Sequence, residues 1–66
     1  MIELSIIIVN WNTKDLLLKC IDSVIKSEPK VSYEIIVVDN GSSDESVEEI
    51  KKLIKRNELI KLIKNK

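Results

Sequence analysis

The sequence has no histidine and only one cysteine, one glycine and one proline among its 66 residues. Without histidine the chain has neither a histidine base nor a histidine metal ligand. A single cysteine, Cys20, cannot form an internal disulfide, and it fits a reducing compartment. One glycine cannot supply the G-x-G-x-x-G or Walker loops that hold nucleotide phosphates. Since no D-x-D carboxylate motif and no nucleophile–base pair occurs either, we expect no catalytic and no metal-binding residue in this chain.

Charge and hydropathy exclude further classes of protein. Eleven Lys and Arg residues balance eleven Asp and Glu residues, so bulk charge does not favour nucleic acid as a partner. The apolar runs are far shorter than a membrane span, and the N-terminus does not have the pattern of a signal peptide. We therefore expect no transmembrane segment, no nucleic-acid partner and a cytoplasmic location.

Three apolar runs predict strands, at residues 4–9, 33–38 and 59–63. The first two runs are continuous and rich in β-branched residues, which is typical of parallel strands buried on both faces. Apolar residues recur at helical spacing after the N-cap candidates Asn12 and Thr13 and stop at Pro29. A second helix is predicted from about residue 43 to residue 56, starting at a capping box formed by Ser42 and Glu45. The element order is therefore β-α-β-α-β, an α/β fold with a three-stranded parallel sheet.

The topology of such a sheet predicts an uncovered face. Crossovers between parallel strands are almost always right-handed, so both helices lie on one face if the strands are in the order 3-2-1. The strands are apolar on both sides, and apolar patches of this size rarely stay exposed on monomers. We therefore expect the open face to be covered by the rest of a larger domain or by association, as in a homo-oligomer.

Polar residues follow the first two predicted strands where ligands bind to open α/β sheets, outside the carboxyl ends of the strands. Asp39 offers two acceptor oxygens for an imide N–H or for ribose hydroxyls, and Gly41 permits a turn with positive φ. Each has a simpler interpretation: Asp39 could hold its own turn, Asn12 could cap a helix and Trp11 could cover the sheet end. The candidate nucleoside-binding residues are Asn10, Trp11, Asn12, Asp39, Asn40 and Gly41.

Other polar residues have structural interpretations. Asp44 and Glu45 suit a helix start, where they would repel a phosphate, so a diphosphate would need a divalent metal with oxygen ligands. The basic run at residues 51–56 is interpreted as a solvated helix face. Cys20, at helical spacing from Leu17 and Val24, is expected to be a small buried apolar residue.

These junctions resemble those of the family 2 glycosyltransferases, which have the GT-A fold. Residues 5–12 read S-I-I-I-V-N-W-N, against S-I-I-I-P-x-Y-N in the family, and residues 37–44 read V-V-D-N-G-S-S-D, against V-V-D-D-G-S-T-D. The segment C-I-D-S-V at residues 20–24 is similar to the L-x-x-C-L-x-S-L pattern between them. Val9, Trp11 and Asn40 depart from the family pattern, and this combination is similar to its rhamnosyltransferase-like branch.

The resemblance implies a partial Rossmann-like nucleotide-binding half-domain, with residues 1–66 as the incomplete N-terminal part of a glycosyltransferase domain. It implies that Asp39 contacts the base or ribose of a UDP- or dTDP-linked sugar, with Trp11 and Asn12 beside the nucleoside. The D-x-D motif and the catalytic base of the family lie further along its chains. A divalent metal, Mg or Mn, is thus expected for the full-length enzyme and none in this chain, which should be inactive alone.

Two rival functions remain open at the level of sequence. The first is a receiver-like binding or regulatory module with Asp39 as its strand-end carboxylate, although the acidic cluster of a first strand is missing. The second is a non-catalytic chain that dimerises through the open sheet face.

Overall fold

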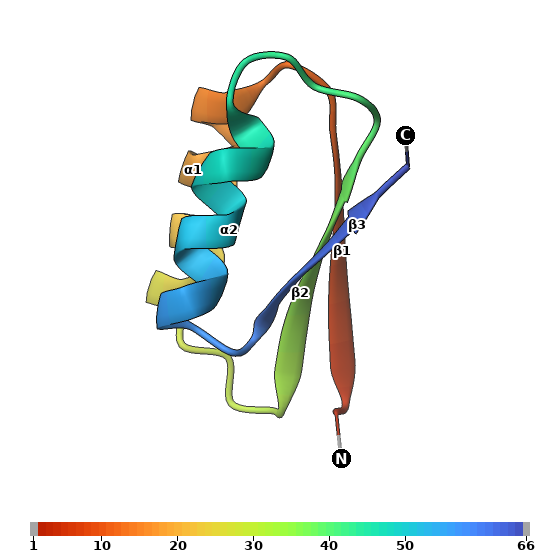
Figure 1. Ribbon diagram of the computed structural model, residues 1–66. Helices are drawn as coiled ribbons and strands as arrows, with labels where there is room; N and C mark the ends of the chain where they lie inside the picture. Colours follow the sequence, from red (N-terminus) through yellow and green to blue (C-terminus); the bar gives the residue numbers. More distant parts are fainter. Residues whose placement is uncertain (1, 66) are drawn as a thin grey trace.

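The computed structural model describes residues 2–65 and shows the predicted element order (Figure 1). The elements are β1 (Leu4–Asn10), α1 (Lys14–Lys26), β2 (Tyr33–Asp39), α2 (Ser46–Arg56) and β3 (Ile60–Lys64). All strands are parallel and lie in the order β1-β2-β3. The predicted α/β fold with a three-stranded parallel sheet is confirmed, and it is consistent with a partial Rossmann-like GT-A half-domain.

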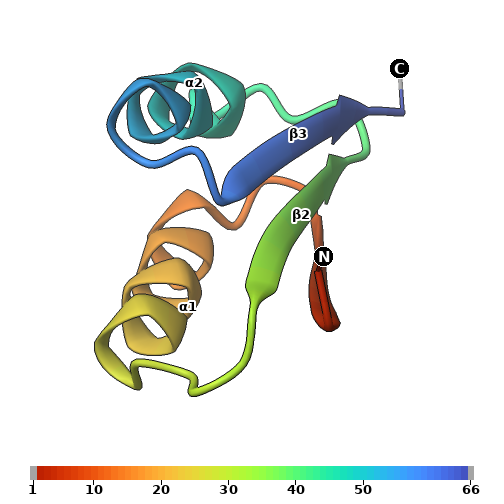
Figure 2. The same ribbon diagram turned by 90° about the horizontal axis from the view of Figure 1, so that it is seen from below.

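Both helices lie on one face of the sheet, as Figures 1 and 2 show from two directions. Each helix connects a strand to its parallel neighbour, and successive connections run the same way across the sheet. Right-handed crossovers in such a sheet place their helices on the same side, which confirms the arrangement expected for this strand order.

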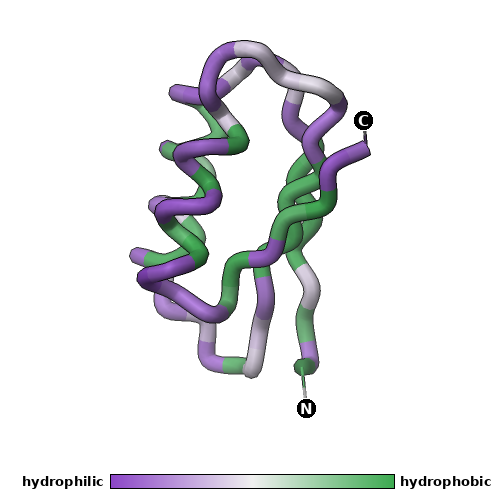
Figure 3. Tube along the Cα trace, in the orientation of Figure 1, coloured by the Kyte–Doolittle hydropathy of each residue, from purple (hydrophilic) through white to green (hydrophobic). Residues whose placement is uncertain are grey.

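The hydrophobic core lies between the helices and the sheet. Ile35 and Val37 of β2 are fully buried, because β2 is the central strand and alternate residues of a strand point to one face. Figure 3 shows hydrophobic residues concentrated along the strands and alternating with hydrophilic residues along the helices. The other buried hydrophobic residues of this core are Leu17, Ile21, Ile50 and Ile60.

The opposite face of the sheet is uncovered by any described residue and is mainly apolar, apart from a polar group formed by Ser5, Glu34 and Lys61. Ile7, Val9 and Ile63 remain 63%, 65% and 53% exposed. Full burial of one such side chain contributes about 1.5–3 kcal/mol, so packing of this face against another surface is favourable. The uncovered face predicted from topology is therefore present.

Helix α2 begins at Ser46, about three residues later than predicted, and the predicted capping box is wrong. Its N-cap residue is Glu45, which has a left-handed backbone with φ 71° and makes no side-chain cap hydrogen bond. Instead, the Asp44 carboxylate accepts from the Ser46 N–H at 3.1 Å and from the Ser46 hydroxyl. The hydroxyl of Ser42, the expected cap, instead donates to Asp39 and accepts from the Asn12 N–H.

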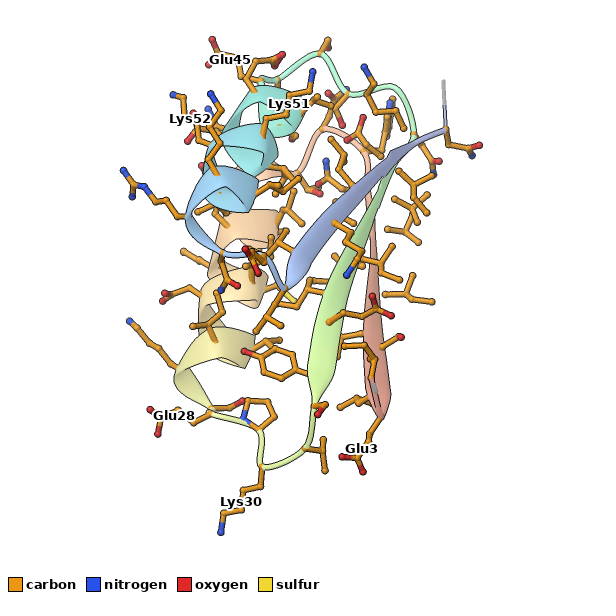
Figure 4. All side chains as sticks on the ribbon, turned by 60° about the horizontal axis from the view of Figure 1, so that its bottom comes forward. Glu3, Glu28, Lys30, Glu45, Lys51 and Lys52 are labelled. Atoms are coloured by element: carbon orange, nitrogen blue, oxygen red, sulfur yellow. The ribbon has the colours of Figure 1, made fainter. Side chains whose placement is uncertain are left out.

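Cys20 is exposed, so the prediction of a buried cysteine is wrong. Leu17 and Ile21 face the core, and Cys20 is one position away from Ile21, about 100° around the helix. On α2, Lys51 and Lys52 are exposed and lie on the outside of the helix (Figure 4). The basic run at residues 51–56 therefore fits its interpretation as a solvated face.

Candidate functional site

The loops after β1 and β2 meet at the carboxyl edge of the sheet. Asn10 and Asp39 are register partners on adjacent strands, and Asn10 Nδ2 donates to Asp39 Oδ1 at 2.8 Å. Both side chains are buried, with 1% and 2% of their surface exposed. The Asn40 N–H donates to the Asn10 carbonyl at 2.9 Å, which continues the strand pairing into the loops. The two predicted junctions are thus brought together.

The Asp39 carboxylate is saturated by protein hydrogen bonds. Oδ1 accepts from Asn10 Nδ2 and from Ser42 Oγ at 2.6 Å, and Oδ2 accepts from the N–H groups of Ser42 at 2.9 Å and Gly41 at 3.2 Å. An ionised carboxylate has about four acceptor positions. Gly41 has φ 87°, the positive value expected for it. Asp39 therefore holds its own turn, and direct contact with a ligand, which stays a prediction, would require exchange of one of these bonds.

Asp39 remains ionised in this buried position because of the same hydrogen bonds. Burial raises the pKa of its carboxyl, but the donors Ser42, Asn10 and Gly41 together hold that pKa below its ordinary value. Hydrogen bonds to a charged form favour that form, and such bonds are stronger than those between neutral groups. The site thus contains a buried negative charge held by neutral donors.

A second set of hydrogen bonds joins the two loops further out. The Asn12 N–H donates to Ser42 Oγ at 2.9 Å, and the Ser43 N–H donates to Asn12 Oδ1 at 2.7 Å. Asp44 Oδ2 accepts from the N–H of Lys14, the first residue of α1, at 2.9 Å. Asp44 therefore caps the starts of both helices, whereas Thr13, the N-cap residue of α1, makes no side-chain cap bond.

Sequence reasoning missed Ser42 and Asp44 as parts of this site, because both were assigned to the helix start. The spacing of Asp39 and Ser42 is that of a local side-chain turn and could have indicated their contact. Asp44 and Lys14 are 30 residues apart, so no local pattern indicates their contact.

Asp44→Ala should lower the melting temperature of the chain by roughly 5–10 °C, since two helix starts lose a cap at once. The melting temperature of Asp44→Asn should lie between those of the parent chain and Asp44→Ala, because its amide has one acceptor oxygen for two groups of donors. Circular dichroism on heating measures both variants.

The matched control is Asp22→Ala, which removes an exposed acid of α1 that pairs only with Lys26 across one helical turn. Such exposed pairs contribute little, so this control should melt close to the parent chain. Equal melting temperatures for the Asp22 and Asp44 variants would show that Asp44 does not fix the loops.

The residue that follows β3, Asn65, contacts this edge and was not predicted. Asn65 donates its N–H to the Asp39 carbonyl at 2.7 Å and its Nδ2 to Asn40 Oδ1 at 2.9 Å. The end of β3 therefore holds the loop after β2 from the other side.

The remaining candidate residues are open to solvent at this edge. Trp11 is 62% exposed, and Asn12, Asn40 and Gly41 are exposed as well. A shallow hollow of about 370 Å³ lies beside Asn12 at the start of α1. A second hollow, of about 360 Å³, is a groove between α1 and α2 and includes none of the predicted residues.

The described part of the chain bears on two further predictions, a metal site and a membrane span. Within residues 2–65, no group of three or more His, Cys, Asp or Glu side chains is placed to hold a metal ion. The metal expected for the full-length enzyme is untested and stays a prediction. Neither described helix combines the length and the apolar character needed to cross a membrane.

Comparisons with known proteins agree with the strand-end motifs. The model of glycosyl transferase family 2 matches residues 5–66. The poly(ribitol-phosphate) beta-glucosyltransferase of Bacillus spizizenii (strain ATCC 23059 / NRRL B-14472 / W23) is 37% identical to the chain over 62 residues. This match covers 92% of the chain, which spans only 10% of the length of that relative. With its parallel β-α-β-α-β fold and a family match over nearly all its residues, the chain belongs to glycosyl transferase family 2.

Proposed function

We propose that the chain forms the nucleoside part of a nucleotide-sugar donor site within a longer family 2 glycosyltransferase. The observation that carries this proposal is that hydrogen bonds join the loops after β1 and β2 at the carboxyl edge of the sheet. Trp11 and Asn12 on the first loop and Asn40 on the second remain exposed. Ligands of open parallel sheets bind at this edge. A UDP- or dTDP-linked sugar is the donor class that we propose, and residues 1–66 are the proposed N-terminal part of the domain.

The six candidate residues divide into two groups by exposure. Trp11 offers an aromatic plane on which a base can stack, and Asn12 and Asn40 offer amides for its polar edge. Asn10 and Asp39 are buried and hold the loops, while Gly41 forms the turn. In this proposal the exposed group contacts the nucleoside and the buried group sets the positions of those contacts.

Sugar transfer needs more than this edge supplies. A nucleotide diphosphate must leave the anomeric carbon while an acceptor hydroxyl loses its proton. The negative charge of the leaving group must therefore be stabilised, and a base must accept the proton. A divalent metal, Mg or Mn, is proposed for the longer enzyme because it would neutralise the diphosphate. The described residues do not provide a ligand cluster for it, and we propose that this chain alone binds a nucleotide without transferring a sugar.

Titration of the chain with UDP and dTDP tests the proposal directly. Trp11 is the single tryptophan, so its fluorescence reports on the candidate site without a label. We expect a saturable change with UDP or dTDP. In calorimetry, Trp11→Ala should weaken binding roughly tenfold, in line with the loss of one base–aromatic stack.

Lys51→Ala on the outside of α2 is the matched control and should bind like the parent chain. Equal affinity of the Trp11 and Lys51 variants would contradict the proposed site. Efficient sugar transfer by the 66-residue chain alone would contradict the proposal that it is inactive.

The receiver-like alternative is not favoured by the geometry. Phosphorylation of Asp39 would need an accessible carboxylate oxygen, but the residue is 2% exposed and both of its oxygens accept protein hydrogen bonds. Incubation with acetyl phosphate should therefore leave the mass of the chain unchanged.

We also propose that the open sheet face associates with a second copy when the chain is alone in solution. Ile7, Val9 and Ile63 form an exposed apolar surface on this face, and burial of such a surface drives association.

A further inference from the structure

The open face of the sheet is divided into an apolar part and a charged part. Successive residues of a strand point to opposite faces, and register partners share one face. Because Ile35 and Val37 are buried on the helical side, Glu34 and Ile36 lie on the open face. The apolar part occupies two adjoining rows of the register and consists of Ile7, Val9, Ile36, Val38 and Ile63.

The charged part lies directly beside these apolar rows. Lys61 is the register partner of Ile36 and therefore ends the first row. Its Nζ lies 3.0 Å from Glu34 Oε1, and Ser5 Oγ donates to Glu34 Oε2 at 2.5 Å. The hydrogen bonds from Ser5 and from Lys61 hold the pKa of the Glu34 carboxyl below its ordinary value. The face thus places a negative charge next to a positive one at the border of its apolar part.

Both charged groups can bind a second partner while they keep the first. An ammonium group has three donors, and each oxygen of an ionised carboxylate has about two acceptor positions. Among the described residues, Lys61 makes one ion pair, and each Glu34 oxygen has one partner. The Lys61 side chain is 54% exposed, so its ammonium can reach a surface that packs on this face.

An acid beside a base makes this surface complementary to its own copy. In a two-fold dimer the same patch occurs on both subunits. A two-fold axis that passes between Glu34 and Lys61 places the Glu34 of each copy opposite the Lys61 of the other. Ile36 is a neighbour of both charged residues on this face, so the same axis brings the Ile36 side chains of the two copies together.

We infer that the open sheet face pairs with a second copy of the chain as a two-fold dimer in which Glu34 and Lys61 form reciprocal ion pairs between the copies. This inference rests on the proposed association of the open face and adds the orientation of the two copies. The four charges form a closed ring in which each acid lies between two bases. Charged pairs across an interface fix its register more than its affinity, and the apolar rows supply the affinity.

Charge reversal tests this orientation. Glu34→Lys makes both members of the pair positive, and Lys61→Glu makes both negative, so each variant alone sets like charges against each other. We expect the dimer of either variant to be weaker than that of the parent chain by at least about thirtyfold. An equimolar mixture should form a mixed dimer at least about tenfold tighter than the dimer of either variant, because every contact across the interface then joins opposite charges.

Sedimentation equilibrium measures these affinities, and circular dichroism shows whether each variant is folded. The double variant, Glu34→Lys with Lys61→Glu, restores alternating charges within and between the copies and should dimerise within about threefold of the parent chain. It keeps the test decisive if a single variant does not fold, since a folded double variant that stays monomeric would overturn the inference.

The matched control is another acid–base pair, Glu49 and Lys52 of α2, whose Oε2 and Nζ lie 3.1 Å apart on the helical side. Glu49→Lys and Lys52→Glu change the net charge in the same way, so their mixture measures the general attraction between oppositely charged copies. Each control variant should dimerise like the parent chain, and mixing them should not tighten the dimer.

Two results would overturn the inferred orientation: no gain on mixing the Glu34 and Lys61 variants, or an equal gain on mixing the control variants. A parent chain that is monomeric at every concentration is a different result. It removes the proposed association itself, as expected if only the remainder of a longer domain covers this face.

Discussion

Asp39→Asn is expected to lower the free energy of unfolding of the chain by about 2–3 kcal/mol. The substitution keeps the shape of the side chain but places an amino group among donors, because Asn10, Gly41 and Ser42 all donate to the Asp39 carboxylate. At least one of these donors then loses its acceptor in a buried position. A domain of this size has roughly 3–10 kcal/mol of stability in total, so the loss is a large part of it. Urea denaturation followed by circular dichroism measures the change.

The same variant should also alter the dependence of stability on pH. Asp39 has its folded-state pKa below the ordinary value of 3.8. A lowered folded-state pKa means that the ionised carboxylate stabilises the fold fully above that ordinary value and stops doing so as pH falls through the folded-state pKa. The parent chain should therefore lose stability on acidification below about pH 4, and Asp39→Asn should lose less over the same range.

The control for both measurements is Asp22→Asn, at an exposed acid on α1 whose side chain pairs only with Lys26. The free energy of unfolding of this variant at neutral pH, and the change of that energy with pH below about pH 4, should match those of the parent chain. Asp39→Asn with parent-like stability would mean that the carboxylate does not hold the two loops together.

Ile7→Lys is expected to abolish self-association of the chain. Ile7 lies on the uncovered sheet face and is 63% exposed. In a symmetric dimer the same patch occurs on both subunits, so one substitution removes two apolar side chains from the interface. At about 1.5–3 kcal/mol for each side chain, the dimer should be weakened more than roughly hundredfold. Sedimentation equilibrium over a wide range of protein concentration measures the dissociation constant.

Leu16→Lys provides a matched control. Leu16 is 67% exposed and lies on α1, on the helical side of the sheet, so the same change in charge and size leaves the open face intact. This variant should dimerise like the parent chain. A parent chain that stays monomeric at every concentration would overturn the proposed association, and equal weakening by both variants would place the interface elsewhere.

Much of the fold follows from local patterns. The β-branched runs at residues 4–9 and 33–38 contain their own strand signal, and the single proline, Pro29, ends the first helical pattern. The apolar character of both faces of these strands, together with the handedness of crossovers, is enough to predict the uncovered face. The start of α2 was predicted wrongly because Ser42 has two possible uses for its hydroxyl. Local sequence favours a helix cap, but the buried Asp39 carboxylate is the partner that it binds.

The sequence by itself determined the order of the elements, the direction of the strands and the family, since all of these depend on periodicity and on short motifs. Only the tertiary structure decided what each polar residue at the sheet edge does. The contacts of Asn10 with Asp39, of Asn12 with Ser43 and of Asp44 with Lys14 join residues 29 to 31 positions apart. A local pattern places a carboxylate at a strand end, but hydrogen bonds between neighbouring loops determine whether its oxygens remain open to a ligand. At this edge they occupy both oxygens of Asp39 and leave Trp11 and Asn12 exposed.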